Sequence, residues 1–199
     1  ALMGLAVGSA IAGQRPVVEL MYLDFIGGWL DQIMNEAAKL RFMTGGKASL
    51  PLVVRTQFGA GRSSGSQHSQ SLEALLAHIP GLKVVMPYRA HDAYGLLREA
   101  IDDDSPVIFI ENRLLYEKSD PTDLPPSSAQ LGKASIAREG TDATIVSWSR
   151  AVGTALQAAD ELSRDGIDAE VLDLRTIVPL DRSAILTSLA KTGRLCVVH

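Results

Sequence analysis

One histidine, His68, is the residue in this sequence that is best suited to proton transfer near neutral pH. It lies in a long loop, Arg55–Gln70, which also holds three glycines and two arginines. An apolar run leads into the loop and a helical pattern, Ser71–Ile79, follows it. Long loops inside compact domains are usually functional. A catalytic role for His68 therefore stands beside two alternatives, a structural or solvated histidine and a flexible surface loop.

Other common chemistries find no support in the sequence. Glycines 59, 61 and 65 have the wrong spacing for a dinucleotide-binding turn, and neither a P-loop nor a Gly-x-Ser-x-Gly elbow is present. A single cysteine with scattered histidines does not make a zinc site. That cysteine, Cys196, lies in an apolar run and is predicted to be a buried, inert thiol, and no disulfide within the chain is possible.

The composition is that of a folded globular protein. Of 199 residues, 46% are hydrophobic, and the formal net charge is -4. With 19 basic against 23 acidic residues and no basic run, nucleic-acid binding is not expected. The apolar first stretch, residues 1–13, is too short to cross a membrane and predicts a buried helix. Its small residues Gly4, Gly8 and Ala12 recur every four positions, so they would permit close packing.

Short apolar strands alternate with helices along the first part of the chain. We expect an α/β fold in which a parallel sheet carries helices on both faces. Ligands of such sheets bind at the carboxyl ends of the strands. The loop of His68, Tyr22–Phe25 and Glu111–Arg113 all follow such ends and should converge on one rim. The expected strands are 17–23, 51–56, 82–86 and 106–111, and the expected helices are 26–40, 71–79 and 92–101.

The chain divides into two expected domains. Residues 1–116 form the first domain, and 117–132 form a linker that is polar and rich in proline. Residues 133–199 form a second α/β unit, with strands at 143–148, 168–174 and 194–198 and helices at 151–162 and 181–189. Both ends look cut, so we expect this chain to be part of a longer protein.

Several segments along the chain carry a family resemblance. They are residues 4–19, 31–39, 67–70, 80–87, 106–116 and 173–181. In order and spacing they resemble the β subunit of thiamine-diphosphate-dependent 2-oxo-acid dehydrogenases, the E1 component. The resemblance implies a pyrimidine-binding, transketolase-like domain over residues 1–116. It also implies the beginning of a transketolase C-terminal domain over residues 133–199.

The resemblance assigns roles to individual residues. His68 matches the active-site histidine that faces the reacting carbon and assists acyl transfer to lipoamide. Phe25 matches the aromatic residue that packs on the aminopyrimidine ring of the cofactor, and Met21 matches a position that lines the same ring. Arg62 could meet a substrate carboxylate or be solvated. The glutamate that activates the cofactor in the family would fall just before Ala1.

A monovalent cation site is also implied by the resemblance. Relatives hold such an ion with main-chain carbonyls, and the matching positions are Leu52, Ala100, Asp103 and Ser105. Free carbonyls at a helix end favour a cation. The ion would be a structural K⁺, with water as the alternative occupant.

The implied reaction is decarboxylation of a 2-oxo acid on thiamine diphosphate, followed by acyl transfer to a lipoyl group on the E2 partner. The implied assembly is an α₂β₂ heterotetramer in which the α subunit holds the diphosphate and Mg²⁺. It would be cytoplasmic if bacterial in type, or in the mitochondrial matrix if eukaryotic, with no membrane or nucleic-acid partner. Two alternatives stay open: an acetoin dehydrogenase β subunit, and a catalytically incompetent fragment that lacks the activating glutamate.

Overall fold

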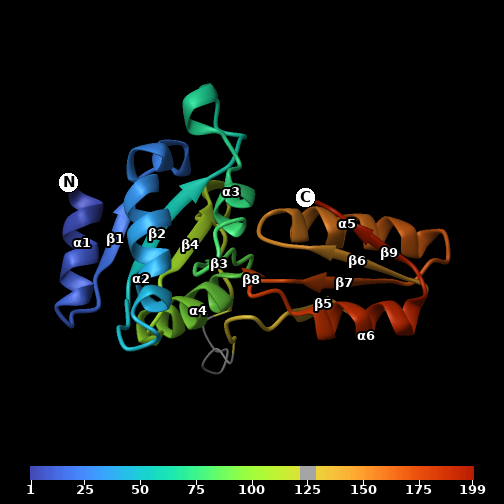
Figure 1. The fold of residues 1–199 in the computed structure, drawn as a ribbon. Helices are drawn as coiled ribbons and strands as arrows, with labels where there is room; N and C mark the ends of the chain where they lie inside the picture. The colour runs from blue at the N-terminus through green and yellow to red at the C-terminus, as the bar shows by residue number, and fades with distance from the viewer. Residues whose placement is uncertain (122–128) are drawn as a thin grey trace.

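Two sheets organise the chain, one in each half (Figure 1). The structure is a computed structural model that describes residues 1–121 and 129–199. The first sheet has the strand order β1-β2-β4-β3-β8, and the second has the order β5-β7-β6-β9. Part of the predicted linker, residues 122–128, lies outside the described residues.

Four parallel strands of the first sheet confirm the predicted architecture. They are β1 (Val17–Leu20), β2 (Val53–Phe58), β4 (Val107–Asn112) and β3 (Lys83–Val85). A fifth strand, β8 (Thr176–Val178), pairs antiparallel with β3, so the sheet is mixed at this edge. This strand was not predicted, because three residues that follow the linker by more than forty positions carry no local pairing signal. It attaches the second half of the chain to the first sheet.

Helices cover both faces of the first sheet. The α-helices are α1 (Leu2–Ile11), α2 (Ala38–Met43), α3 (Glu73–Ala77) and α4 (Ala90–Asp102). The short helices are the 3₁₀ turns η1 (Leu23–Trp29), η3 (Ser66–His68) and η4 (Arg113–Leu115), and the π segment η2 (Gln32–Ala37). The prediction of one regular helix over 26–40 was therefore wrong in its geometry. Glycines 27 and 28 weaken the first turn as α-helix, and spacing alone does not separate 3₁₀, α and π windings.

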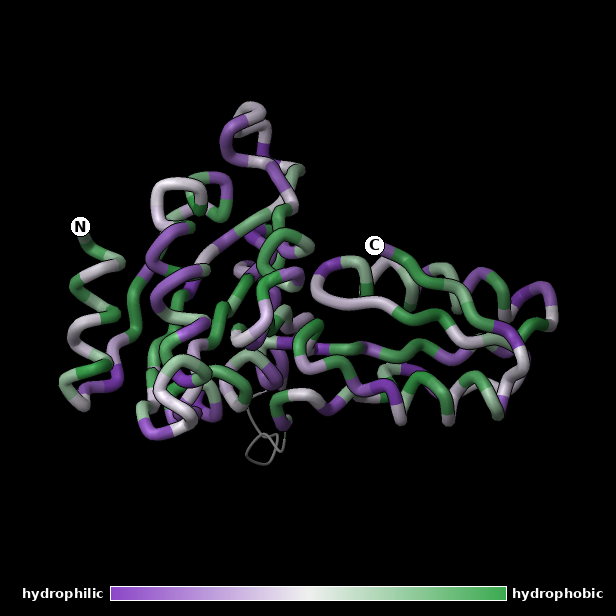
Figure 2. The backbone as a smooth tube through the Cα atoms, viewed as in Figure 1, coloured by the Kyte–Doolittle hydropathy of each residue, from purple (hydrophilic) through white to green (hydrophobic). Residues whose placement is uncertain are grey.

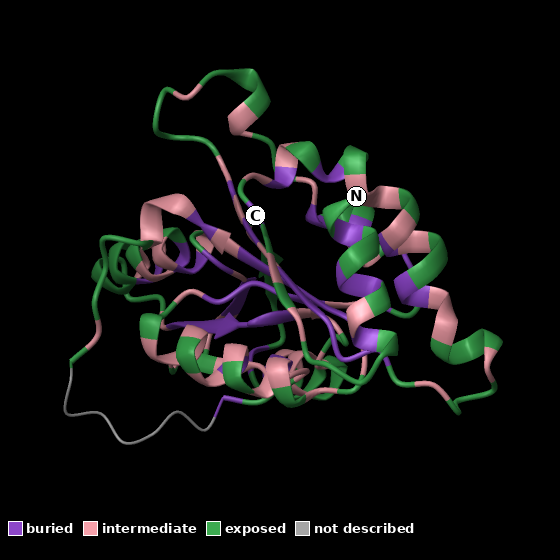
Figure 3. Cartoon of the chain, turned by 90° about the vertical axis from the view of Figure 1, so that its left-hand side faces the viewer, coloured by how far each residue is buried: buried purple, intermediate pink, exposed green. Residues whose placement is uncertain are grey.

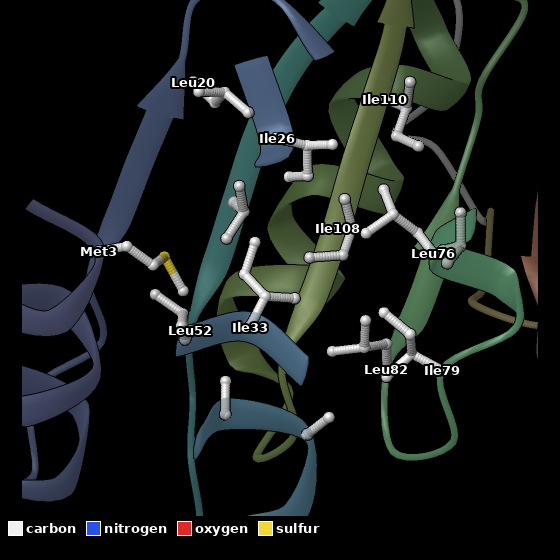
Figure 4. Close-up of a cluster of buried hydrophobic side chains, with 14 of the residues drawn as sticks. Met3, Leu20, Ile26, Ile33, Leu52, Leu76, Ile79, Leu82, Ile108 and Ile110 are labelled. Carbon is white, nitrogen blue, oxygen red and sulfur yellow. The ribbon is translucent and has the colours of Figure 1, made fainter. Parts of the chain in front are cut away.

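The strands β2, β3 and β4 of the first sheet are mostly buried, whereas Val17 and Glu19 of the edge strand β1 are exposed. Val54, Ile108 and Ile110 belong to one buried cluster with residues of α1 and η2. Figure 4 shows Ile108 and Ile110 in this cluster with Met3 of α1 and Ile33 of η2. Val53, Val107 and Phe109 face α4 on the opposite side. Each fully buried aliphatic side chain contributes roughly 1.5–3 kcal/mol through the hydrophobic effect. Residues 107–110 of β4 are consequently a continuous apolar run, and green tube segments mark apolar runs of this kind in Figure 2.

Helix α1 packs on the sheet through one face only. Met3, Ala6, Val7 and Ala10 are buried, whereas the face of small residues is exposed. The prediction that Gly4, Gly8 and Ala12 permit close packing stays a prediction, because α1 contacts the sheet of this chain through other residues. Figure 3 shows buried and exposed segments alternating along the helices near the N-terminus. Among the described residues, no helix has both the length and the apolar character to cross a bilayer.

The second sheet lies between two helices, α5 (Ala151–Arg164) and α6 (Arg182–Thr192). Its strands are β6 (Ala143–Ser147), β7 (Ala169–Asp173) and β9 (Leu195–Val197), which are parallel, and β5 (Ser135–Arg138), which is antiparallel to β7. Cys196 is exposed on β9, so the prediction of a buried thiol was wrong. Strand β9 is an edge strand, and an apolar run there has the same sequence pattern as one in a sheet interior.

Candidate active site

His68 lies on a loop that rises from the carboxyl end of β2 (Figure 1). The chain enters the last turn of this loop through Gly65, whose φ of 81° is a conformation that glycine adopts without strain. The backbone N–H of His68 donates to the Gly65 carbonyl over 3.2 Å, which closes the 3₁₀ turn η3. The imidazole is half-buried in this position. The loop therefore presents His68 as a part of the rim, not as a freely solvated side chain.

Three rings meet at this rim. The centroid of the His68 ring lies 4.5 Å from that of Tyr22 and 5.4 Å from that of Phe25, with interplanar angles of 85° and 82°. Tyr22 and Phe25 are themselves edge-to-face at 6.3 Å. Such edge-to-face pairs are favourable by about 0.5–1.5 kcal/mol beyond the area that they bury. The segment after β1 and the loop after β2 are thus brought together, as predicted for two strand ends.

The third predicted strand end joins the same cluster. The guanidinium of Arg113, which follows β4, lies over the Tyr22 ring at 5.0 Å from its centroid. Arg113 also donates from Nη1 to the Ser64 hydroxyl over 3.3 Å. The sequence singled out Arg113 only as part of residues 111–113, and it did not indicate that Arg113 and His68 would both contact the Tyr22 ring. Three strand ends therefore converge on one rim, as expected.

Asp24 links the first of these segments to the loop of His68. Its Oδ1 atom accepts hydrogen bonds from the backbone N–H of Ser69 at 3.1 Å and of Gln70 at 3.0 Å. The Gln70 side chain donates to the same oxygen from Nε2 over 3.0 Å. Sequence reasoning did not single out Asp24, because its partners lie 45 and 46 positions away.

Two apolar side chains on the rim are exposed. Phe25 is 48% exposed and Met21, directly after β1, is 59% exposed. A flat aromatic face and an adaptable thioether beside an imidazole fit an aromatic heterocycle such as an aminopyrimidine. No cluster of three or more acidic, histidine or cysteine side chains that could hold a metal occurs within residues 1–121 and 129–199.

The predicted cation positions lie at the end of α4 and the beginning of β2. The Leu52 carbonyl accepts a hydrogen bond from the Val107 N–H at 2.9 Å. The Asp103 carbonyl accepts from Arg15 Nη1 at 3.1 Å, and Arg15 also reaches the Ile101 carbonyl. A guanidinium thus already lies against the carboxyl end of α4, where free carbonyls favour positive charge. A carbonyl oxygen retains a second lone pair, so these bonds are compatible with an ion as well.

Arg62 has a partner within the chain. Its Nη2 atom lies 2.5 Å from Glu117 Oε1, and the carboxylate is largely exposed. Exposed ion pairs of this kind are worth about 0–1 kcal/mol. Arg62 is therefore paired within the chain, and a substrate carboxylate would share the guanidinium with Glu117 or compete with it.

An ionic network lies beside the rim on the α4 side of the sheet. Arg55 Nε donates to Glu111 Oε2 over 2.6 Å, and the Tyr116 hydroxyl lies 3.2 Å from the same oxygen. Burial, followed by the negative charge of Glu111, raises the pKa of the Tyr116 hydroxyl to about 12. Tyr116 is therefore a neutral hydrogen-bond donor throughout the physiological range.

A cavity of about 370 Å³ opens between the two sheets, below the loop of His68. Residues from both halves of the chain line it, among them Phe58, Asn112, Trp148 and Arg150. Gly59 also borders the cavity, and a side chain there would overlap the Asn112 amide. His68, Phe25 and Met21 do not line this cavity.

Comparison with known families agrees with this geometry. Residues 1–118 match the family described as the pyrimidine binding domain of transketolase, and residues 132–199 match the transketolase C-terminal domain. A solved structure described as a split gene transketolase, an inactive beta4 tetramer, superposes with a TM-score of 0.82. It is 24% identical and covers 99% of this chain and 61% of its own, so it shows the fold.

Curated relatives are much closer in sequence. Subunit beta of acetoin:2,6-dichlorophenolindophenol oxidoreductase from Bacillus subtilis (strain 168) is 50% identical over 196 residues, covering 98% of this chain and 57% of the relative. Pyruvate dehydrogenase E1 component subunit beta-2, mitochondrial, from Oryza sativa subsp. japonica is 52% identical over 200 residues, covering 98% and 53%. The chain thus spans little more than half the length of these relatives.

Proposed function

This chain belongs to the transketolase family, and we propose that it contributes the β-subunit side of a thiamine-diphosphate enzyme that decarboxylates a 2-oxo acid and transfers the acyl group to a lipoyl carrier. The observation that carries the proposal is the ring cluster of His68, Tyr22 and Phe25 at the strand ends. Relatives at about half identity over nearly the entire chain are named as beta subunits of a pyruvate dehydrogenase E1 component and of an acetoin oxidoreductase, which supports it.

Each rim residue has a part in the proposed reaction. Thiamine diphosphate, when bound, supplies the electron sink for decarboxylation. Phe25 and Met21 would orient its aminopyrimidine ring by presenting exposed apolar surface to one face. His68 would hold and move a proton at the oxygen of the reacting carbonyl during transfer to the lipoyl sulfur. Because the imidazole is half-buried against two rings, it would be held in one orientation during that transfer.

In the proposed assembly, a second subunit completes the cofactor site. An α-type subunit would cover the exposed faces of Phe25 and Met21 and hold the diphosphate with its Mg²⁺. Two such αβ pairs would form an α₂β₂ heterotetramer, and a lipoyl-bearing E2 protein would be the acyl acceptor. We further propose a structural K⁺ on the carbonyls of Leu52, Ala100, Asp103 and Ser105. The assembly would be cytoplasmic in a bacterial source or lie in the matrix in a mitochondrial one.

A second candidate substrate is acetoin. The relative named for acetoin oxidation and the one named for pyruvate dehydrogenase differ by only 2% in identity to this chain, at 50% and 52%. Sequence similarity therefore does not separate the two substrates. Both reactions would use the same rim residues, so the choice concerns the substrate and leaves the role of His68 unchanged.

The test uses the complete β-type protein that contains this chain, reconstituted with its α-type partner. Turnover of pyruvate, branched-chain 2-oxo acids and acetoin is measured with a lipoyl acceptor. We expect His68→Ala to lower the rate with the preferred substrate by about 10²–10⁴-fold, the usual contribution of acid–base catalysis. His78→Ala, an exposed histidine at the end of α3, is the matched control. Unchanged turnover in His68→Ala would refute the proposed role.

A further inference from the structure

Asp24 accepts hydrogen bonds from both backbone N–H groups that follow His68, and we infer that it is a positioning residue. It would hold the imidazole against the surface formed by Tyr22 and Phe25. The inference rests on the proposed function of His68. Asp24 carries no ring of its own and acts on the loop through hydrogen bonds.

The hydrogen bonds converge on one atom. Asp24 Oδ1 accepts from Ser69 N, Gln70 N and Gln70 Nε2, at 3.0–3.1 Å. Hydrogen bonds to an ionised acceptor are about twice as strong as those between neutral groups. The other oxygen, Oδ2, is buried and has no hydrogen-bond partner among the described residues. All three hydrogen bonds from the loop of His68 to Asp24 therefore end on a single oxygen, Oδ1.

Apart from the ring contacts of His68, the remaining hydrogen bonds and ion pairs of the loop are local or weak. The His68 N–H and the Ser69 hydroxyl both bond to the Gly65 carbonyl, which shapes the turn but does not attach it to the sheet. On the other arm of the loop, Arg62 pairs with an exposed carboxylate, and Arg113 reaches Ser64 at 3.3 Å. Asp24 thus supplies the anchor nearest to His68.

The position of Asp24 in the chain links the loop of His68 to the segment that carries Tyr22 and Phe25. Asp24 lies between Tyr22 and Phe25 in the turn η1, so the same short segment provides the ring surface and holds the loop. Asp24 is bonded in sequence to Phe25 and hydrogen-bonded to the two residues that follow His68. It therefore helps to fix the 5.4 Å separation between the ring centroids of His68 and Phe25. A misplacement of about 1 Å at a catalytic group can cost about 10²-fold in rate. Asp24 would therefore act on turnover through His68.

Two measurements test the inference. In the first, hydrogen exchange is followed at the Ser69 and Gln70 amides of Asp24→Ala, Asp24→Asn and the parent protein. We expect faster exchange at these two amides in Asp24→Ala, and less change in Asp24→Asn, which retains an acceptor oxygen. The control is Asp31→Ala, because Asp31 is exposed and bonds locally to Asn35 at 2.6 Å. Unchanged exchange in Asp24→Ala would overturn the anchoring.

In the second, the same variants are assayed in the reconstituted enzyme. We expect Asp24→Ala to lower kcat for lipoyl-dependent turnover by about 10–100-fold with a small change in KM for the 2-oxo acid. Asp24→Asn should recover most of that loss. Faster exchange with unchanged kcat would overturn the positioning role. A parent enzyme that turned over none of the substrates would instead refute the proposed function, and the exchange result would still decide the anchoring.

Discussion

Arg175 donates from Nη1 to Asp92 Oδ1 over 3.1 Å, and this ion pair joins the second half of the chain to helix α4 of the first. Both side chains are nearly buried, at 11% and 13% exposed. Arg175 also donates from Nη2 to the Ala134 carbonyl, and its own carbonyl accepts from Met86 N–H at 2.7 Å. One residue thus fixes the place where β8 joins the sheet of the first domain.

Removing the carboxylate of this pair should destabilise the chain strongly. Asp92→Ala would leave the Arg175 guanidinium charged, buried and without its ionic partner, so we expect a loss of about 3 kcal/mol in the free energy of unfolding. Denaturant unfolding measures it. The control is Asp104→Ala, which breaks the exposed pair with Arg15 and should cost less than about 1 kcal/mol. Equal losses in the two variants would show that Arg175 is effectively solvated.

Asp173 should make stability fall as pH rises. Burial raises the pKa of its carboxyl to about 7, against a normal aspartate pKa of about 3.9 in the unfolded chain. Between these two values the native state binds more protons than the unfolded state. The contribution is therefore complete below about pH 4 and is lost as pH rises through 7. The slope is at most about 1.4 kcal/mol per pH unit.

The variant Asp173→Asn isolates this effect. The amide retains the Oδ1 acceptor that the Arg175 N–H uses at 3.0 Å, but it does not titrate. We expect the free energy of unfolding of the parent chain to fall between pH 5 and 7 relative to that of the variant, because this range lies between the unfolded and folded pKa values of Asp173. Urea unfolding across this range measures the difference. Asp165→Asn, at an exposed aspartate after α5, is the control, and a parallel pH dependence of Asp173→Asn and parent would contradict the prediction.

The order of strands and helices could be predicted because burial on both faces produces unbroken apolar runs. Such runs mark Val53, Val107 and their neighbours regardless of what packs on them. The loop of His68 was identified for the same reason, as the polar segment between two such elements. The same rule failed at Cys196, since an apolar run does not indicate whether its strand lies inside a sheet or at its edge.

Features that depend on distant partners could not be predicted. Strand β8 forms because Val84 and Val178 meet across more than ninety positions, and three residues carry no periodicity of their own. Asp24 looks like an ordinary polar residue near a turn until Ser69 and Gln70 lie beside it. The family resemblance assigned His68 and Phe25, but the ring contact between them is a property of the folded chain.

Tyr116 should ionise at unusually high pH because of its burial and, after that, because of the charge of Glu111. Burial and the nearby carboxylate hold its pKa at about 12, while the charge of Arg55 opposes the shift. Glu111→Gln removes the negative charge and leaves Arg55 unpaired, so both changes lower the tyrosine pKa. Ultraviolet titration of tyrosinate, with Tyr116→Phe identifying the signal, measures the change. An unaltered pKa in Glu111→Gln would show that burial alone is responsible.

Gly81 should be the glycine least tolerant of a side chain, because its backbone passes directly over the end of another helix. It has a φ of 105°, and a Cβ there would overlap the Ala38 carbonyl oxygen at the beginning of α2. Gly13 offers a matched control, since its φ is 91° and no atom lies within 4 Å of the added Cβ. Alanine at either position adds the backbone strain of positive φ, about 1–2 kcal/mol.

Only Gly81→Ala adds the overlap with backbone, which a side-chain rotation cannot relieve. We expect it to lower the free energy of unfolding by about 1–3 kcal/mol more than Gly13→Ala does, as overpacking typically costs. Parallel urea unfolding of the two variants and the parent measures both terms, because the difference between the variants removes the shared backbone strain. Equal losses would mean that the turn before β3 can move away from α2, and that the contact between them contributes little to the fold.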